Sequence, residues 1–448
     1  MILQNKLLTF YSEKNVSFMF LLWLLTLPFG ASIVSFSIGF ATIYPNLLIS
    51  LILAPLGFRM FNSFSVVFKV LISLLFLLLV QSVILFPSIN GKQEALFDIH
   101  SISLFLLFIF NLFSVYSKLT KENFYNILLK GLYAYLYLLI IFGGVETMIG
   151  IHIEGGYTEK LSQGLALIHY TPIFLYDNPN DFLVYVISLT LLLLLIDKKL
   201  IVNRAKIILI LAIELFFAHM ALSRFSILIL ITLMLYVLFV TYKDYFNRNN
   251  RLIITYSIIS IILIFSVKSL YLGPMLITYF AKKNDPVLLK QTSEKIGEEV
   301  NLVVIKDTIT PPLDSYTVRK NLMINGYKIA KSHPILGCGP GQFKYNLKKY
   351  ESKYPIDKNY SPHNYGIELI SQYGIIGAVL YLIPFVLLVY LFIILKHRNI
   401  LFALSIIYYY ILSLIPSSFL YLDINWVFIG VIFIYSVDII NKGNRKLC

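Results

Sequence analysis

The sequence predicts an all-α, polytopic membrane protein with about twelve transmembrane helices. Of its 448 residues, 58% are hydrophobic and only 13% are charged, which leaves too little polar surface to cover a water-soluble globule of this size. Residues 66–89, 252–272 and 375–395 are apolar runs that reach the roughly 20 residues a spanning helix needs. They are apolar on every face, whereas the strands of a membrane barrel alternate apolar and polar residues. Length and pattern together therefore favour helices that cross the bilayer.

Hydropathy along the chain places the individual spans. We expect them near residues 17–36, 38–57, 66–89, 100–116, 124–149, 181–196, 207–222, 224–242, 252–272, 365–395, 400–416 and 419–440. The first of these offers no convincing signal-peptidase site, so it is expected to stay as an anchor.

The distribution of lysine and arginine predicts the orientation. With a cytoplasmic N-terminus, the inner short loops and both tails hold 17 Lys and Arg residues, and the outer short loops hold only Lys92 and Lys160. Cytoplasmic loops of membrane proteins carry this excess of basic residues. Both termini are therefore expected in the cytoplasm.

One connection is much longer than the others. Residues 273–364 form a polar segment of 92 residues between spans nine and ten, on the outer side, within what we interpret as a single integral membrane domain, 1–448. Its 14 basic against 8 acidic residues suit an anionic substrate or simply a solvated loop. Residues 317–332 place apolar side chains three and four positions apart, which predicts an amphipathic helix ended by His333-Pro334; the apolar positions are Val318, Leu322, Met323, Gly326, Tyr327 and Ala330.

Several classes of protein are disfavoured by what the sequence lacks. The net charge of +14 falls in short clusters between apolar runs, which argues against a nucleic-acid partner. There is no phosphate-binding glycine loop, no Cys/His cluster with zinc spacing and no Asp-x-Asp pair in an outer loop. We therefore expect no cofactor and no metal. Cys338 and Cys448 are predicted on opposite sides of the membrane, so no disulfide is expected.

Two arginines are candidates for binding an anion. Arg224 stands where two apolar runs meet with hardly any linker, so its guanidinium must lie at the outer interface or in a cavity. It either snorkels to lipid phosphates or supplies the planar, multi-donor cation that a buried pyrophosphate site requires. Arg319 lies on the amphipathic segment beside Lys320, where a solvated charge is the alternative to an anion site.

His363 is the candidate for proton transfer. It lies in Ser361-Pro362-His363-Asn364-Tyr365, where the long loop returns to the membrane at span ten. Histidine titrates near neutrality and can accept a proton from a hydroxyl, although an N-terminal helix residue in an interfacial belt is an equal interpretation.

Polar side chains also precede span six. Asn178, Asn180 and Asp181 are expected either to cap that helix, through Asn180 or Asp181, or to contact sugar hydroxyls. Other charged residues near span ends are expected to be interfacial anchors, although Glu146 and Lys268 lie deep enough on the outer side to be functional candidates as well; these residues are Lys69, Lys130, Glu146, Glu214, Lys268 and Asp438.

A family resemblance gathers these residues together. The run 332–343, SHPILGCGPGQF, is followed by Pro362-His363-Asn364 and then by 368–377, ELISQYGIIG. With Arg224, Arg319 and the polar residues before span six, this pattern resembles the O-antigen ligase and polymerase superfamily over residues 175–395. Cys338 departs from the small aliphatic residue expected there. Gly337, Gly339 and Gly341 of this run are expected to form a tight loop that lets backbone approach closely.

The resemblance implies a metal-independent membrane glycosyltransferase in the bacterial cytoplasmic membrane, with its active site on the outer face. The donor would be a glycan on undecaprenyl pyrophosphate, and an acceptor hydroxyl would attack with inversion at the sugar carbon. Arg224 and Arg319 would bind the pyrophosphate, and His363 would orient or deprotonate the acceptor hydroxyl. Asn178, Asn180, Asp181 and Asn364 would be further substrate contacts.

The acceptor distinguishes three hypotheses within this superfamily. We favour a polymerase of O-antigen, capsule or exopolysaccharide repeat units, which would add a chain-length regulator as a candidate partner. Ligation to lipid A core and transfer to protein are the alternatives. A flippase or transporter is the hypothesis from another class, but the large outer loop and the candidate residues at one face argue against it.

Overall fold

The computed structural model describes the backbone of thirteen stretches of the chain. They are residues 10–27, 36–38, 41–43, 45–149, 172–174, 179–197, 200, 204–221, 223–243, 315–347, 364–394, 399–414 and 421–444. Two compact units are distinguished: residues 1–132 with 312–448, and residues 133–311. Each is taken by itself.

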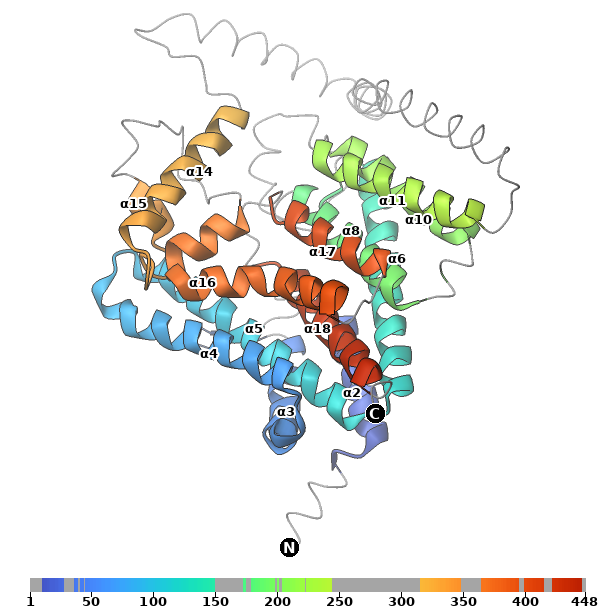
Figure 1. The fold of residues 1–448 in the computed structure, drawn as a ribbon, viewed down its shortest axis with the longest axis horizontal. Helices are drawn as coiled ribbons and strands as arrows, with labels where there is room; N and C mark the ends of the chain where they lie inside the picture. The colour runs from blue at the N-terminus through green and yellow to red at the C-terminus, as the bar shows by residue number, and fades with distance from the viewer. Residues whose placement is uncertain are drawn as a thin grey trace, which may run out of the picture. The chain divides into compact units, whose positions relative to one another are not determined.

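The first unit is built from helices of both ends of the chain (Figure 1). Serine or asparagine side chains cap several of them: Ser12, Ser65, Asn364 and Asn399 each accept a hydrogen bond from a backbone N–H of the first turn. The helices are α2 (Glu13–Thr26), α3 (Pro45–Met60), α4 (Val66–Leu85), α5 (Lys92–Lys118), the start of α6 (Lys121–Ile149), α14 (Ser315–Ser332), α15 (Phe343–Leu347), α16 (Tyr365–Val389), α17 (Ile400–Leu412) and α18 (Asp423–Asn444).

Seven helices in the described part of the chain are long and apolar enough to cross a membrane. They cover Pro45–Ser63, Val66–Ser88, Lys92–Lys118, Lys121–Ile149, Pro179–Ile196, Tyr365–Phe392 and Asp423–Asn441. Phe225–Leu238 and Ile400–Leu412 are shorter apolar helices, and the expected span 252–272 lies outside the described residues. The chain is thus a polytopic, helical membrane protein, while the count of twelve stays a prediction.

A small hairpin replaces part of the first two expected spans. β1 (Phe36–Ile38) and β2 (Ala41–Ile43) pair antiparallel, with Ile38 opposite Ala41. In sequence, a Gly-X pair, Gly39-Phe40, stands between two short runs with β-branched residues, which is typical of a two-residue hairpin connection. The expectation of helix over 17–36 and 38–57 is therefore wrong at residues 36, 38 and 41–43.

Helix α5 is central to the core of the first unit, where it contacts α2, α3, α4 and α18. Aromatic pairs fix these contacts: Phe68 stacks on Phe113 with ring centroids 3.8 Å apart, and Trp23 lies 4.5 Å from Phe108. The buried Trp23 indole N–H donates to Ser50 Oγ at 2.8 Å. Such pairs stabilise the packing beyond the apolar area they bury.

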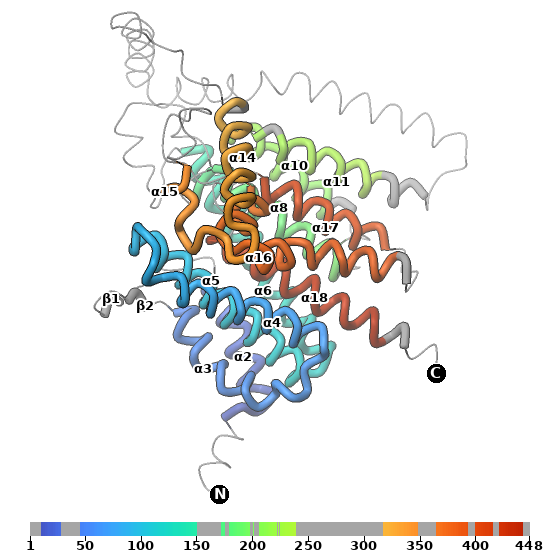
Figure 2. Tube along the Cα trace, turned by 60° about the vertical axis from the view of Figure 1, so that its left-hand side comes forward, coloured from blue at the N-terminus to red at the C-terminus, as the bar shows by residue number. Residues whose placement is uncertain are grey.

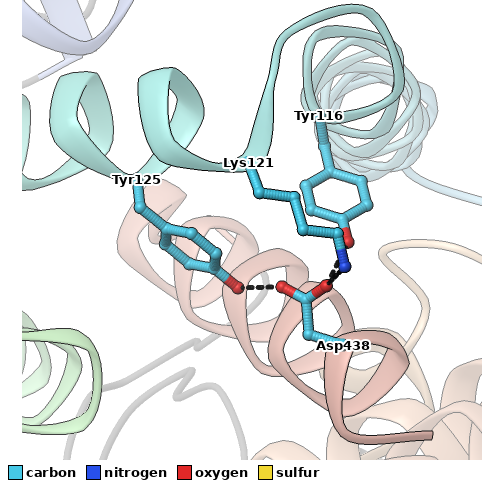
Figure 3. A network of polar contacts seen from close by, with 4 residues as sticks. All are labelled: Tyr116, Lys121, Tyr125 and Asp438. Carbon is cyan, nitrogen blue, oxygen red and sulfur yellow. Dashed lines mark hydrogen bonds and ion pairs between the residues drawn. The ribbon is translucent and has the colours of Figure 1, made fainter. Parts of the chain in front are cut away.

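Asp438 of α18 joins several helices at the C-terminal end of α5 (Figure 3). Its carboxylate accepts hydrogen bonds from the hydroxyls of Tyr116, at 2.6 Å, and Tyr125, at 2.7 Å. Lys121 forms an ion pair with the same carboxylate. Asp438 is therefore more than an interfacial anchor, because it ties α18 to α5 and to the start of α6.

The second unit contains the rest of α6 together with α8 (Pro179–Ile196), α10 (Arg204–Met220) and α11 (Arg224–Lys243). Its buried acidic residues have structural partners. Glu146 Oε2 accepts the backbone N–H groups of Ile173 and Phe174 at 2.8 and 2.7 Å, and the Thr190 hydroxyl donates to Glu214. Glu146 thus holds the turn at residues 173–174, while Lys268 lies outside the described residues.

Candidate functional site

Helix α16 is broken ten residues after its N-cap. Gly374 has φ 58° and ψ −136°, which interrupts the helical hydrogen bonds. The carbonyls exposed by the break find other donors: Cys338 N–H bonds Ser371 O at 2.9 Å, Gly339 N–H bonds Gln372 O at 3.0 Å, and the Gln81 amide bonds Tyr373 O at 3.3 Å. A broken membrane helix is tolerated where neighbouring groups satisfy its backbone in this way.

Two of these donors, Cys338 and Gly339, belong to the segment that we call the glycine turn, residues 333–342. Gly337 and Gly341 both have φ 67°, a conformation that suits glycine. A Cβ on Gly337 would overlap the backbone of Gln372, and a Cβ on Gly341 would come 2.6 Å from the backbone carbon of Glu94. The expectation that these glycines allow close approach of the backbone is confirmed.

Asp98 of α5 is the side chain on which the glycine turn and α16 converge. It is 1% exposed, and its Oδ2 accepts the Gly341 N–H at 2.7 Å and the Tyr373 hydroxyl at 3.0 Å. The Tyr421 hydroxyl, from the link between α17 and α18, donates to Oδ1. One buried carboxylate therefore binds three separate segments.

The predicted amphipathic helix is confirmed as α14, which ends at Ser332 immediately before His333-Pro334. Its buried face matches the expected one at Leu322, Gly326 and Ala330 and differs from it at Met323 and Tyr327. Leu322 and Ile329 are buried in a cluster with Phe343 and Leu347, whereas Met323 and Tyr327 are 45% and 64% exposed. Asn325, which was not among the expected positions, is buried as well, and Gly326 lets Ile367 of α16 approach closely.

Helix α14 and the first part of α16 lie side by side and run in the same direction (Figures 1 and 2). Gly326 meets Ile367, and residues 335–339 of the glycine turn bond to residues 371–375. At the rise of an α-helix, Arg319 lies about 10 Å from Gly326 toward the N-terminus of α14, and Asn364 lies about 5 Å from Ile367 toward the N-terminus of α16. Both residues therefore stand toward the N-terminal end of this helix pair.

Arg319 is half-buried, whereas its neighbour Lys320 is exposed. Burial lowers the pKa of the Arg319 guanidinium from its ordinary value, but an arginine remains charged at neutral pH. No acidic residue in the described part of the chain forms an ion pair with it. The N-termini of two parallel helices add partial positive charge at the same end, so the region suits an anion.

The loop end that contains His363 is partly described. Asn364 is the N-cap of α16, and its Oδ1 accepts the Ile367 N–H at 3.0 Å. His363 lies outside the described residues, but it is joined directly to Asn364 in the chain. The capping bond accounts for Asn364, whose contact with substrate stays a prediction.

Arg224 is the first residue of α11, and only residues 221–223 separate it from the end of α10. Its side chain lies outside the described part of the structure. The preceding Ser223 is buried, and its Oγ lies 2.9 Å from Ser226 Oγ. A cation at a helix N-terminus is opposed by the helix dipole, so helix stability does not explain an arginine at this position.

Of the polar residues expected before span six, two lie inside helix α8 and one lies outside the described residues. Helix α8 begins at Pro179, so Asn180 and Asp181 lie inside its first turn and neither is its N-cap, which corrects our expectation. Asp181 is buried, and as an acidic residue in the first turn it interacts favourably with the dipole of α8. Asn178 lies outside the described residues.

Comparison with known families identifies the region that contains these features. Residues 207–382 match the family described as O-Antigen ligase. The match runs from α10 through the glycine turn and past the break in α16, and it includes Arg224, Arg319 and His363. This chain carries an O-antigen ligase family domain. It is accordingly a membrane enzyme of the glycosyltransferase type that acts in surface polysaccharide synthesis on lipid-linked glycans. A search of curated proteins finds no match.

Asp98, Gln81 and Tyr421 were not predicted from the sequence. Asp98 lies six residues into α5 yet before the apolar run that marks the span, so it resembles a loop residue in sequence. The signal that could have found it is an acidic residue four positions after Glu94 that turns toward the apolar side of the helix. The described residues contain no group of three His, Cys, Asp or Glu side chains that could hold a metal; the metal-independent reaction stays a prediction.

Proposed function

We propose that this protein polymerises glycan repeat units of a bacterial surface polysaccharide on the outer face of the cytoplasmic membrane. The donor is a glycan on undecaprenyl pyrophosphate, and the acceptor is a sugar hydroxyl of a second lipid-linked glycan. The observation that carries the proposal is the half-buried Arg319 near the N-terminal end of two parallel helices, within the matched family region.

The chemistry assigns one role to each residue. The acceptor oxygen attacks the anomeric carbon as the bond from that carbon to the pyrophosphate oxygen breaks, with inversion. The electron pair leaves with undecaprenyl pyrophosphate, whose charge Arg319 offsets through charge-assisted hydrogen bonds. The acceptor proton passes to His363.

The family resemblance gives Arg224 the same pyrophosphate-binding role, and its assignment rests on sequence and on its position at the start of α11. Asn178, Asn180, Asp181 and Asn364 are proposed substrate contacts on the same basis. Both termini are proposed to be cytoplasmic, as the distribution of Lys and Arg predicts. A chain-length regulator is the proposed protein partner.

Deletion of the gene tests the choice of acceptor. A polymerase predicts that long polysaccharide chains disappear while a single repeat unit is still attached to its final acceptor. A ligase to lipid A core predicts instead that full-length lipid-linked polymer accumulates. Loss of glycan from a protein, with polysaccharide unchanged, would assign the chain to the protein-transferring branch.

A further inference from the structure

Asp98 joins three segments that the chain brings from far apart. Its carboxylate accepts from the glycine turn through the Gly341 N–H at 2.7 Å, from α16 through the Tyr373 hydroxyl at 3.0 Å, and from the link before α18 through the Tyr421 hydroxyl. The Tyr421 hydroxyl keeps its proton at neutral pH and therefore acts as the donor in this bond.

Further bonds fasten the same region to the start of α5. The Gln342 amide donates to Asn90 O, and Lys344 Nζ lies 3.8 Å from Glu94 Oε1. Gln81 of α4 donates to Leu336 O and, at 3.3 Å, to Tyr373 O. Among these side chains, Asp98 bonds both the glycine turn, at Gly341, and the side chain of Tyr373, which directly precedes the break at Gly374.

We propose that Asp98 is a positioning residue for glycosyl transfer: it holds the glycine turn against the break in α16 and thereby sets Arg319 on α14 relative to the N-terminus of α16 at Asn364. This inference rests on the proposed function. Asp98 is remote from the reacting atoms, because Tyr373 is about 13 Å along α16 from Asn364 at the rise of an α-helix.

A small change in the bonds of Asp98 at the break in α16 would displace the N-terminus of that helix. A tilt of about 5° at the break would move the N-terminus of α16 by about 1 Å, given a helix segment of that length. Displacements of this size are enough to lower the rate of a positioned reaction by about 100-fold. Arg319, on the separate helix α14, would still be able to bind the donor.

Asp438 provides a matched control, because it is also a buried carboxylate that accepts from two tyrosine hydroxyls. It lies at the other end of α5, away from the glycine turn.

Full-length protein carrying Asp98→Asn or Asp438→Asn is purified, and transfer from a defined undecaprenyl-pyrophosphate glycan is measured per folded molecule. For Asp98→Asn we expect kcat to fall about 100-fold with the donor KM changed by less than about threefold. Asp438→Asn is expected to keep kcat within about twofold even where it lowers thermal stability. An Asp98→Asn enzyme with wild-type kcat would overturn the inference.

A second readout does not depend on activity. Cys338 lies in the glycine turn, its N–H bonds Ser371 O, and its side chain packs against the Leu322 cluster. In a Cys448→Ser background, Asp98→Asn is expected to accelerate alkylation of Cys338 by a maleimide about tenfold or more, and Asp438→Asn to leave it unchanged. Equal alkylation in all three proteins would show that Asp98 does not lock the turn. A wild-type protein with no transfer activity would overturn the proposed function and the catalytic part of this inference, while the alkylation rates would still decide whether the lock exists.

Discussion

Arg319 and Lys320 are adjacent cations in different surroundings. Lys320 is exposed, whereas Arg319 is half-buried and has no acidic partner in the described part of the chain. A desolvated guanidinium interacts more strongly with a phosphate than a solvated ammonium does. The two side chains therefore allow the anion-binding role to be tested one residue at a time.

Substitution of Arg319 by glutamine is expected to lower kcat/KM for the lipid-linked donor by about 100-fold, and substitution by lysine by about tenfold. The loss reflects the charge-assisted hydrogen bonds that lysine reproduces only in part. Steady-state transfer by purified protein measures it, with Lys320→Gln as the exposed control. Equal activity of Arg319→Gln and Lys320→Gln would remove Arg319 from the site.

Among single residues, the position of Arg224 could be predicted from the sequence, whereas the role of Asp98 could not. Arg224 was expected where two apolar runs meet, and α10 and α11 are indeed separated there by only three residues. The role of Asp98 could not be derived from the sequence even where its position draws notice, because that role depends on the Gly341 N–H, which is 243 residues away in the chain. Hydrogen bonds to the backbone of distant segments leave no local pattern.

At the scale of elements, the glycine turn and the broken helix α16 form one structural piece. The glycines were expected to make a tight loop, and positive φ angles together with close backbone approach confirm it. The break at Gly374 was not expected, since hydropathy predicts a single helix over residues 365–395. Hydropathy reports burial in the bilayer but not the conformation of a single glycine.

Alanine at Gly337 is expected to destabilise the protein by about 2 kcal/mol or more, since a left-handed residue gains Cβ strain and the Gln372 backbone occupies the space. Gly144 is the control, because it lies in α6 with open space around it. Alanine there should be neutral or stabilise by up to about 1 kcal/mol. Thermal unfolding in detergent, followed by tryptophan fluorescence, measures both. A Gly337→Ala protein as stable as wild type would contradict the described turn.

Gln81→Leu removes the side-chain donor to the carbonyls of Leu336 and Tyr373. We expect a loss of about 1–3 kcal/mol, because a buried carbonyl then lacks its partner. Ser103→Ala serves for comparison, since the Ser103 hydroxyl donates to the carbonyl of Ile99 within its own helix. If the two variants unfold at the same temperature, Gln81 does not support the break.

At the scale of the whole molecule, the class of protein was predictable because apolar length and composition act over hundreds of residues. Seven membrane-length helices in the described residues agree with a polytopic protein. The exact spans were less predictable, as the hairpin at residues 36–43 shows. Short runs of β-branched and small residues satisfy hydropathy equally well as strand or helix.

Orientation is tested by cysteine accessibility in intact cells. In a Cys338→Ser, Cys448→Ser background, Tyr327→Cys on the exposed side of α14 should react with a membrane-impermeant maleimide. Lys118→Cys, an exposed position at the end of α5, should react only after the membrane is permeabilised. The reverse pattern would place Arg319 on the cytoplasmic side and exclude transfer at the outer face.

The most direct measurement of the central claim is transfer by the purified protein in lipid nanodiscs, supplied with one defined undecaprenyl-pyrophosphate repeat unit and no added metal. We predict lipid-linked glycans of two or more repeats, together with one released undecaprenyl pyrophosphate for each bond formed. His363→Ala should form neither product while inserting and accumulating normally. A wild-type protein that leaves the repeat unit unchanged, or a His363→Ala protein that elongates it at the wild-type rate, would contradict the account.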